Sequence, residues 1–328
     1  MANSDQSKVV QPIREQRHGR VNKAEPSAWE LGGLSVGQLG KRLWTNMDAD
    51  HDDAFGRAAE LSYYFLLAIF PGLLFLMTII GLIAGNNPDM QNSLFSYAGQ
   101  VLPGSALQIV QKTVQETVKA SGGLKLIIGL VGALWSASSG MSSLMTVLNQ
   151  VHHVKDQRPF WKSRLLIAPG LTIALSLMML VALGIVLFGG AAATWAGHHG
   201  LGNFAVLAWR IAQWPVALAF VVLAFAVLYY AAPDLQKRKW YWITPGSLGG
   251  VLLWVVASIA FRIYLHFFNS YSATYGSLGA VIILMLWFYI TSLSLLIGSE
   301  INAEIENAAA EHGRADAKFK GEKKAPAA

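Results

Sequence analysis

The chain has 328 residues, of which 54% are hydrophobic and only 13% are charged. About a quarter of the residues in a soluble domain are charged, so these proportions exclude one large soluble domain and favour a protein that lies in a bilayer. The formal net charge of +6 does not by itself indicate nucleic-acid binding, because in a membrane protein the placement of Lys and Arg relative to the spans decides their meaning. The chain has no cysteine, which excludes disulfides and thiolate metal sites.

Two polar segments at the ends of the sequence lack the apolar content needed for a core. They cover residues 1–33 and 308–328, and we expect both to be disordered cytoplasmic tails. The first holds no short apolar stretch ending in a cleavage site, so we expect no removable signal peptide. Residues 34–307 then form one integral membrane domain.

A short amphipathic segment precedes the first long apolar run. Val36, Leu39, Leu43 and Met47 share one helical face, and Trp44 lies beside it. This pattern predicts an interfacial helix that lies on the inner leaflet.

Six mainly apolar runs have the length of about 18 or more residues that a spanning helix requires. Unbroken runs of this kind exclude a β-barrel, whose strands alternate apolar and polar residues. We therefore predict an all-α fold, a polytopic membrane bundle with six transmembrane helices. The runs cover residues 61–84, 124–147, 165–190, 204–230, 243–267 and 275–299.

Lys and Arg concentrate before the first run, after the second and fourth runs, and in the C-terminal tail. By the positive-inside rule these parts are cytoplasmic, and so are both termini. The connection over residues 86–123 is then an outer loop. Leu107, Val110, Val114 and Val118 recur there at helical spacing, which predicts an outer amphipathic helix.

Three carboxylates lie at predicted cytoplasmic ends of spans. Glu60 directly precedes the first apolar run, and Glu300 and Glu304 share a helix face at the end of the last one. All three could meet at one membrane level, where burial would make them candidates for substrate binding or proton coupling. The alternative is that they are interfacial charges that mark helix ends.

Two basic residues stand near the outer end of the fifth run. Arg262 and His266 lie at positions i and i+4 and could form a cationic ring for an anionic substrate or a lipid headgroup. The alternative is that Arg262 snorkels to the outer interface.

Proline and small residues shape the predicted spans. Pro71 removes a backbone hydrogen bond within the first span and should kink it. Small residues at four-residue spacing allow another helix to approach closely. These predicted packing positions are Gly132, Ser136 and Gly140 in the second span, Gly246 and Gly250 in the fifth, and Gly276 in the sixth.

No motif for a cofactor, a metal or a nucleophile occurs in the sequence. Phosphate-binding loops, dinucleotide fingerprints, nucleophile elbows and zinc helices are absent. We therefore expect no cofactor, no metal and no catalytic residues, and the sequence favours a protein that is not an enzyme.

Four stretches together give the chain a family resemblance over some four-fifths of its length. They are "ELSYYFLLAIFPGLLFL", "LWSASSGMSSLMTVLNQVHHVKDQRPFWKSRLL", "YYAAPDLQKRKWYWITPGSLGGVLLW" and "SYSATYGSLGAVIILMLWFYITSLSLLIGSEINAEIE". In their order and in their residues they resemble the YihY/BrkB family of bacterial inner-membrane proteins. The resemblance implies a six-helix protein of the bacterial cytoplasmic membrane, in a family that has carried a ribonuclease name and whose activity is not settled.

Our leading hypothesis is a transporter or exporter of an anionic or amphipathic substrate. The expected partners are the lipid bilayer and a small-molecule or lipid substrate, with no nucleic acid, and a homo-oligomer stays open. The alternative is a scaffolding protein of the cell envelope that acts through the outer helix and the tails. A hydrolytic, ribonuclease-type role is the weaker third hypothesis, because the basic residues follow the positive-inside pattern and no metal-binding set of His and Asp occurs.

Overall fold

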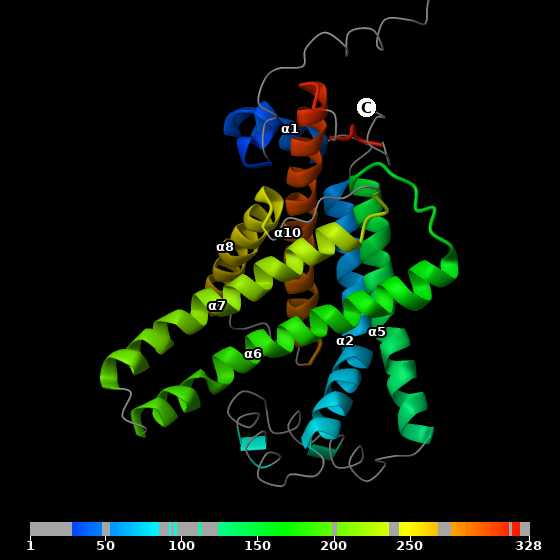
Figure 1. Cartoon of the computed structure of the whole chain (residues 1–328). Helices are drawn as coiled ribbons and strands as arrows, with labels where there is room; N and C mark the ends of the chain where they lie inside the picture. Colours follow the sequence, from blue (N-terminus) through cyan, green and yellow to red (C-terminus); the bar gives the residue numbers. More distant parts are fainter. Residues whose placement is uncertain are drawn as a thin grey trace, which may run out of the picture.

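The structure, a computed structural model, describes residues 28–47, 53–84, 92, 95–96, 111–112, 124–198, 202–235, 243–267, 277–314 and 317–321. Within these ranges all regular structure is helical and no strand occurs (Figure 1). The predicted all-α class is therefore confirmed for the described part of the chain.

Six long helices coincide with the six apolar runs. They are α2 (Ala54–Ala84), α5 (Leu124–Val151), α6 (Ala168–His198), α7 (Gly202–Ala231), α8 (Pro245–Phe267) and α10 (Ser277–Glu311). Four helical segments among the described residues are long and apolar enough to cross a membrane, by length and composition: Lys162–Ala182, Val206–Ala231, Pro245–Phe267 and Val281–Glu311. The count of six spans stays a prediction.

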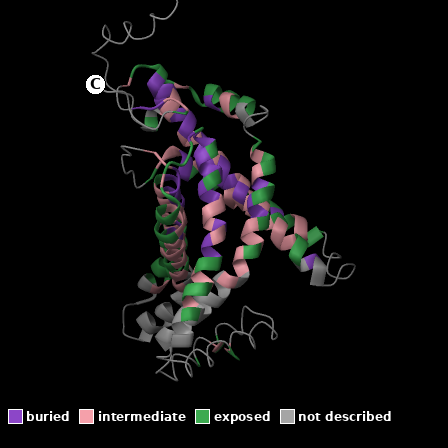
Figure 2. Cartoon of the chain, turned by 90° about the vertical axis from the view of Figure 1, so that its right-hand side faces the viewer, coloured by how far each residue is buried: buried purple, intermediate pink, exposed green. Residues whose placement is uncertain are grey.

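Helix α10 is the centre of the bundle, because it packs against α2, α5 and α8 as well as the N-terminal elements. Helices α6 and α7 pack against each other, and in Figure 1 this pair leans away from the upright α10. The buried core joins α5, α7 and α10 through Leu144, Leu148, Phe225 and Leu296. In Figure 2 the buried residues gather mainly in the half of the molecule that carries the C-terminus.

Glycines bring α8 unusually close to α10. A Cβ atom on Gly246 would overlap the carbonyl oxygen of Gly298, and one on Gly250 would lie 3.1 Å from the carbonyl oxygen of Ser294. The hydroxyl of Tyr229, from α7, donates to the carbonyl of Leu295 at 2.8 Å. The glycines therefore let α8 and α10 approach with their backbones close together, and Tyr229 joins α7 to the same place.

A capping box fixes the start of α8. The backbone N–H of Ser247 donates to Thr244 Oγ1, and that of Thr244 donates to Ser247 Oγ, both at 3.0 Å. Asn302 of α10 completes this arrangement by accepting from the N–H of Gly246 at 2.9 Å. The pattern Thr-Pro-Gly-Ser thus begins α8 beside the end of α10.

Two short elements precede α2. The 3₁₀ turn η2 (Ala28–Gly33) and helix α1 (Val36–Met47) both pack against α10. A second capping box begins α1, since Ser35 and Gln38 exchange backbone-to-side-chain hydrogen bonds. Of the predicted apolar face, Leu39 is buried and Val36 is exposed. That α1 lies on a membrane surface stays a prediction.

Helix α10 continues beyond the predicted span, and a turn after its last residue then reverses the direction of the chain. It ends at Glu311 in a Schellman motif, in which Gly313 has φ +85° and the N–H of Arg314 donates to Ala309. Residues 317–321 return along the helix, and Ala317 is buried there. Part of the segment from residue 308 thus packs on the alanine-rich end of α10, which offers it a small apolar surface, and the disorder expected for this tail stays a prediction. Residues 1–27 of the other expected tail, and most of the predicted outer helix, lie outside the described residues.

Candidate functional site

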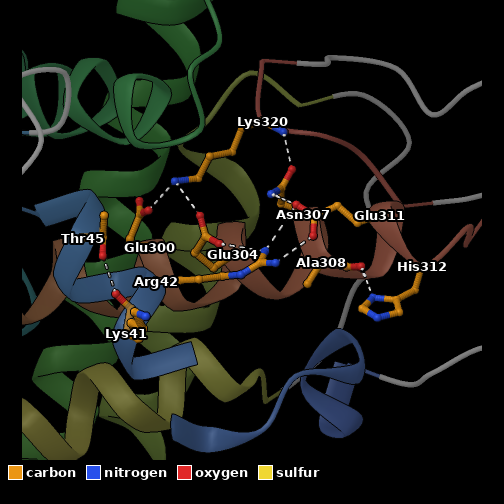
Figure 3. A network of polar contacts seen from close by, with 10 residues as sticks. All are labelled: Lys41, Arg42, Thr45, Glu300, Glu304, Asn307, Ala308, Glu311, His312 and Lys320. Carbon is orange, nitrogen blue, oxygen red and sulfur yellow. Dashed lines mark hydrogen bonds and ion pairs between the residues drawn. The ribbon is translucent and has the colours of Figure 1, made fainter. Parts of the chain in front are cut away.

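Two buried carboxylates stand on one face of α10 near its C-terminal end. Glu300 is 6% exposed and Glu304 is 3% exposed, and Figure 3 shows both side chains pointing toward basic groups that come from outside α10. A buried carboxylate is stable only where cations or hydrogen-bond donors compensate its charge. The partners described below supply that compensation, and we call Arg42, Glu300, Glu304, Glu311 and Lys320 the carboxylate cluster.

Lys320, from the returning C-terminal segment, bridges the two buried carboxylates. Its ammonium pairs with Glu300 and lies 2.9 Å from Glu304 Oε1. Burial lowers the pKa of Lys320, but the charges and hydrogen bonds of Glu300 and Glu304 outweigh this effect, so the pKa is raised above its ordinary value. The lysine is therefore charged at neutral pH.

Arg42, from α1, contacts the same helix face at Glu304 and, about two turns further along, at Glu311. Its guanidinium forms a fork with Glu311, with Nη2 2.9 Å from Oε2 and Nη1 3.3 Å from Oε1. Its Nη1 also lies 3.7 Å from Glu304 Oε2. The hydrogen bond to Glu311 raises the pKa of Arg42, more than burial lowers it. Glu304 thus lies between a cation from α1 and a cation from the tail.

Backbone hydrogen bonds hold the returning segment in place. The N–H of Lys320 donates to Asn307 Oδ1 at 3.2 Å, and the N–H of Gly321 donates to the carbonyl of His152 at 3.1 Å. The ring of His152 lies 3.4 Å from the hydroxyl of Ser299. The segment therefore joins α10 to the end of α5 as well as carrying its ammonium to the carboxylates.

A second group of ion pairs lies just after the C-terminal ends of α5 and α7. Arg158 makes two bonds to Asp156, at 2.9 and 2.7 Å, and donates to the carbonyl of Ala232 at 2.9 Å. Asn149 accepts from the backbone N–H of Asp234 at 2.6 Å. Burial raises the pKa of Asp156, but the hydrogen bonds from Arg158 more than offset this and hold it below its ordinary value. This group fastens the loop after α5 to the end of α7.

The structure does not bring Glu60 into the carboxylate cluster. Glu60 is exposed on α2, whereas its neighbours Leu61 and Ser62 are buried. The helix turns its apolar side to the core at this point, so the preceding carboxylate faces outward. Only Glu300 and Glu304, of the three predicted carboxylates, lie together.

Arg262 and His266 are both exposed on α8. Next to them Phe261 is buried, while Ile263 and Phe267 are exposed. Their predicted role in binding an anion or a headgroup stays a prediction.

The predicted kink and the predicted packing positions lie in different surroundings. Pro71 lies inside α2, which continues through it, and the kink stays a prediction. A Cβ atom on Gly140 would lie 3.0 Å from Ala68 of α2. Among the described residues none comes within 4 Å of a Cβ atom built on Gly132, and Ser136 is exposed. Gly276 lies outside the described residues.

Sequence reasoning missed Arg42 and Lys320 as partners of the carboxylates. The sequence marks both only as basic residues of the predicted cytoplasmic side. Both lie too far from the glutamates in the sequence for an i, i+4 spacing to link them. The reversal at Gly313 is the local signal for Lys320, because glycine just after a helix favours a left-handed turn. For metal binding, no group of three or more His, Asp or Glu with suitable geometry occurs in the described part of the chain.

The family model of virulence factor BrkB matches residues 46–322. The chain belongs to the BrkB family. The resemblance seen in the sequence motifs is thereby confirmed, and this is a family of membrane proteins. The matched range of the BrkB model contains Glu300, Glu304 and Lys320, whereas Arg42 precedes it.

Named relatives support the same membership. The chain is 34% identical to the ribonuclease-like protein YfkH of Bacillus subtilis, over 75% of this chain and 88% of that protein. It is 26% identical to a UPF0761 membrane protein of Xanthomonas campestris and 25% identical to UPF0761 membrane protein XOO3417 of Xanthomonas oryzae, over 80% of this chain. The chain spans 59% of the length of these Xanthomonas proteins. The ribonuclease term belongs to the name of YfkH. No solved structure matches the chain.

Proposed function

We propose that this BrkB-family chain moves an anionic or amphipathic substrate across or within the membrane, and that the carboxylate cluster is the gate at one end. One observation carries the proposal. The two buried carboxylates of α10 receive cations from Arg42 of α1 and from Lys320 of the returning segment, and both of these elements lie at the edge of the bundle.

This arrangement can have two states. While the cations are in place, the charges compensate one another and the end of α10 stays covered. If α1 or the returning segment moves away, Glu300 and Glu304 lose part of that compensation and favour contact with water. The helices of the bundle need not rearrange for this to happen. A substrate or ion that competes for these charges would therefore open the gate.

The membrane and the orientation of the chain are part of the proposal. Arg42 and Lys320 belong to the two terminal parts, and both contact the same end of α10. This supports a topology in which both termini lie on one side, and the excess of Lys and Arg there favours the cytoplasm. For a bacterial member of the family, we place the chain in the cytoplasmic membrane.

The experiment is a substrate-movement assay in proteoliposomes. Vesicles would contain either fluorescent phosphatidylglycerol, followed by quenching from outside, or a fluorescent organic anion, followed by release. We expect movement above that of empty vesicles, and a change of rate of about tenfold for Glu304→Gln, which weakens a charge-assisted pair.

Glu60→Gln is the matched control, because it removes an exposed carboxylate near the start of the same bundle. If neither substrate moves faster than in empty vesicles, the transport proposal fails for both classes. If Glu304→Gln and Glu60→Gln give the same rate as the unmodified protein, the carboxylate cluster is not the gate. No described contact favours the scaffolding alternative, since it depends mainly on residues 103–120, most of which lie outside the described residues.

A further inference from the structure

Arg164 lies in a half-buried position at the first turn of an apolar span. It belongs to η3 (Lys162–Ile167), a short π-helical segment that leads directly into α6. Its Nη1 donates to Ser142 Oγ of α5 at 2.6 Å and lies 3.4 Å from the carbonyl of Ser138. Its Cζ lies 4.7 Å from the ring centre of Trp135. The side chain is therefore fixed against α5 by both polar and cation–π contacts.

Arg164 has no acidic partner in the part of the chain that the structure describes. Among the described residues no carboxylate lies within ion-pair distance of it, and both of its hydrogen bonds are made by Nη1. A guanidinium has five N–H donors in a planar fork. The donors on Nε and Nη2 thus lack an acceptor within the described part of the protein, in a place that is only partly open to solvent.

The residues around Arg164 are of the kinds expected at the level of lipid headgroups. Phe160 and Trp161, just before η3, are 76% and 57% exposed, and Leu165 and Leu166, just after Arg164, are 53% and 59% exposed. Exposed aromatic residues followed by exposed leucines are typical of the boundary between headgroups and acyl chains. The membrane-length segment Lys162–Ala182 starts at the same point.

The serines of α5 position the arginine and leave its fork available. Ser142 Oγ donates its own proton to the carbonyl of Ser138 at 3.1 Å, so its lone pairs accept from Arg164. Ser139 and Ser143 likewise donate to carbonyls of their own helix. No hydroxyl of this group carries a charge that could neutralise the guanidinium.

We propose that Arg164 binds the phosphate of an anionic phospholipid headgroup. A phosphate fits the fork formed by Nε and Nη2 in a bidentate arrangement and supplies the missing negative charge. Lys162, which is exposed two residues earlier, adds attraction to an anionic leaflet. This inference goes beyond the transport proposal, since the site binds lipid whether or not the chain moves a substrate.

The test measures lipid retained by the purified protein. The chain in mild detergent would be titrated with phosphatidylglycerol or with phosphatidylcholine of the same acyl chains, and bound lipid counted by native mass spectrometry. We expect Arg164→Ala to weaken phosphatidylglycerol binding about tenfold to a hundredfold, the range for a charge-assisted hydrogen bond. The control Arg210→Ala, which removes an exposed arginine of α7, should leave binding unchanged.

Two further variants separate the role of the fork from an effect on folding. Arg164→Lys keeps the charge but not the bidentate geometry and should lose an intermediate amount of affinity. Ser142→Ala keeps the guanidinium but removes its shorter hydrogen bond to α5, and should weaken binding less than Arg164→Ala does.

Two outcomes would overturn the inference. Equal phosphatidylglycerol binding by Arg164→Ala and Arg210→Ala, with Arg164→Lys also unchanged, would mean that water alone solvates this arginine. Competition by inorganic phosphate at the same concentration as phosphatidylglycerol would mean that the site takes free phosphate rather than a headgroup.

Discussion

Two pairs of ionisable residues in this chain have the same spacing and opposite surroundings. Glu300 and Glu304 on α10, like Arg262 and His266 on α8, lie at positions i and i+4. The glutamates are buried and paired with cations from two other elements, while Arg262 and His266 are exposed. Spacing therefore determines which residues share a helix face, but the segments that pack on that face determine whether they are buried.

Small residues explain why other segments pack around the glutamates. Ala308, Ala309 and Ala310 follow them on α10 and are all buried. A Cβ atom on Gly32 of η2 would lie 2.9 Å from the backbone nitrogen of Ala309. The N-terminal turn and the returning tail can thus approach the backbone of α10, whereas on α8 the neighbours of Arg262 include the exposed Ile263.

The largest expected effect comes from removing one buried carboxylate. Glu304→Ala leaves Arg42 and Lys320 short of a partner and should destabilise the protein by about 3 kcal/mol, the cost of breaking a buried ion pair. Arg262→Ala should change stability by less than about 0.5 kcal/mol, as for other exposed positions. Unfolding in mixed micelles of a mild detergent and dodecyl sulfate would measure both, and equal losses would contradict the comparison.

The next largest effect tests the close contact of α8 and α10. Gly246→Ala places a methyl group against the carbonyl of Gly298 and should cost about 2 kcal/mol through overpacking. Gly132→Ala has open space among the described residues and should stabilise α5 by up to about 1 kcal/mol, because alanine favours a helix. The same unfolding assay applies. A stable Gly246→Ala variant would show that α8 and α10 can separate without cost.

A smaller effect should follow from changing the turn after α10. Gly313 has φ +85°, so Gly313→Val should cost about 1 to 2 kcal/mol at a position where a side chain is strained. The returning segment should then detach, which hydrogen exchange at the backbone amide of Lys320 would detect as faster exchange. Gly37→Val, on the exposed side of α1, is the control and should leave that amide protected.

The smallest effect concerns the pH dependence of the Lys320 contribution. Its pKa is raised in the folded protein, so its stabilising effect is fully present below the ordinary lysine value of about 10.4 and is lost as pH rises through the folded-state pKa. Lys320→Met leaves two buried carboxylates without this cation and should cost about 3 kcal/mol. The effect expected to be small is the change of this cost with pH, which should stay constant between neutral pH and about pH 10. A difference that disappears near neutral pH would contradict the charged pairing.

The sequence allowed much of the helical arrangement to be predicted, because long apolar runs have few alternatives in a bilayer. The ends of helices were harder. Helix α10 continues from the predicted end near Ser299 to Glu311, since its glutamates are paired and its alanines favour a helix. The shared face of Glu300 and Glu304 followed from their spacing.

The partners of these glutamates could not be predicted in the same way. Arg42 and Lys320 reach α10 through tertiary contacts between distant segments, and such contacts leave no periodic pattern in the sequence. Glu60 shows the converse case, in which the sequence suggests a contact that the fold does not make. It precedes the first apolar run as Glu300 follows the last one, yet the orientation of α2 leaves it exposed.

The order of residues in the carboxylate cluster also has a consequence for biosynthesis. Arg42 precedes α10 in the chain, and Lys320 follows both glutamates. During synthesis Glu300 and Glu304 are therefore made while only one of their two cations exists. The segment after α10 completes the compensation of charge, so a chain shortened to end before Lys320 would keep both glutamates without that cation.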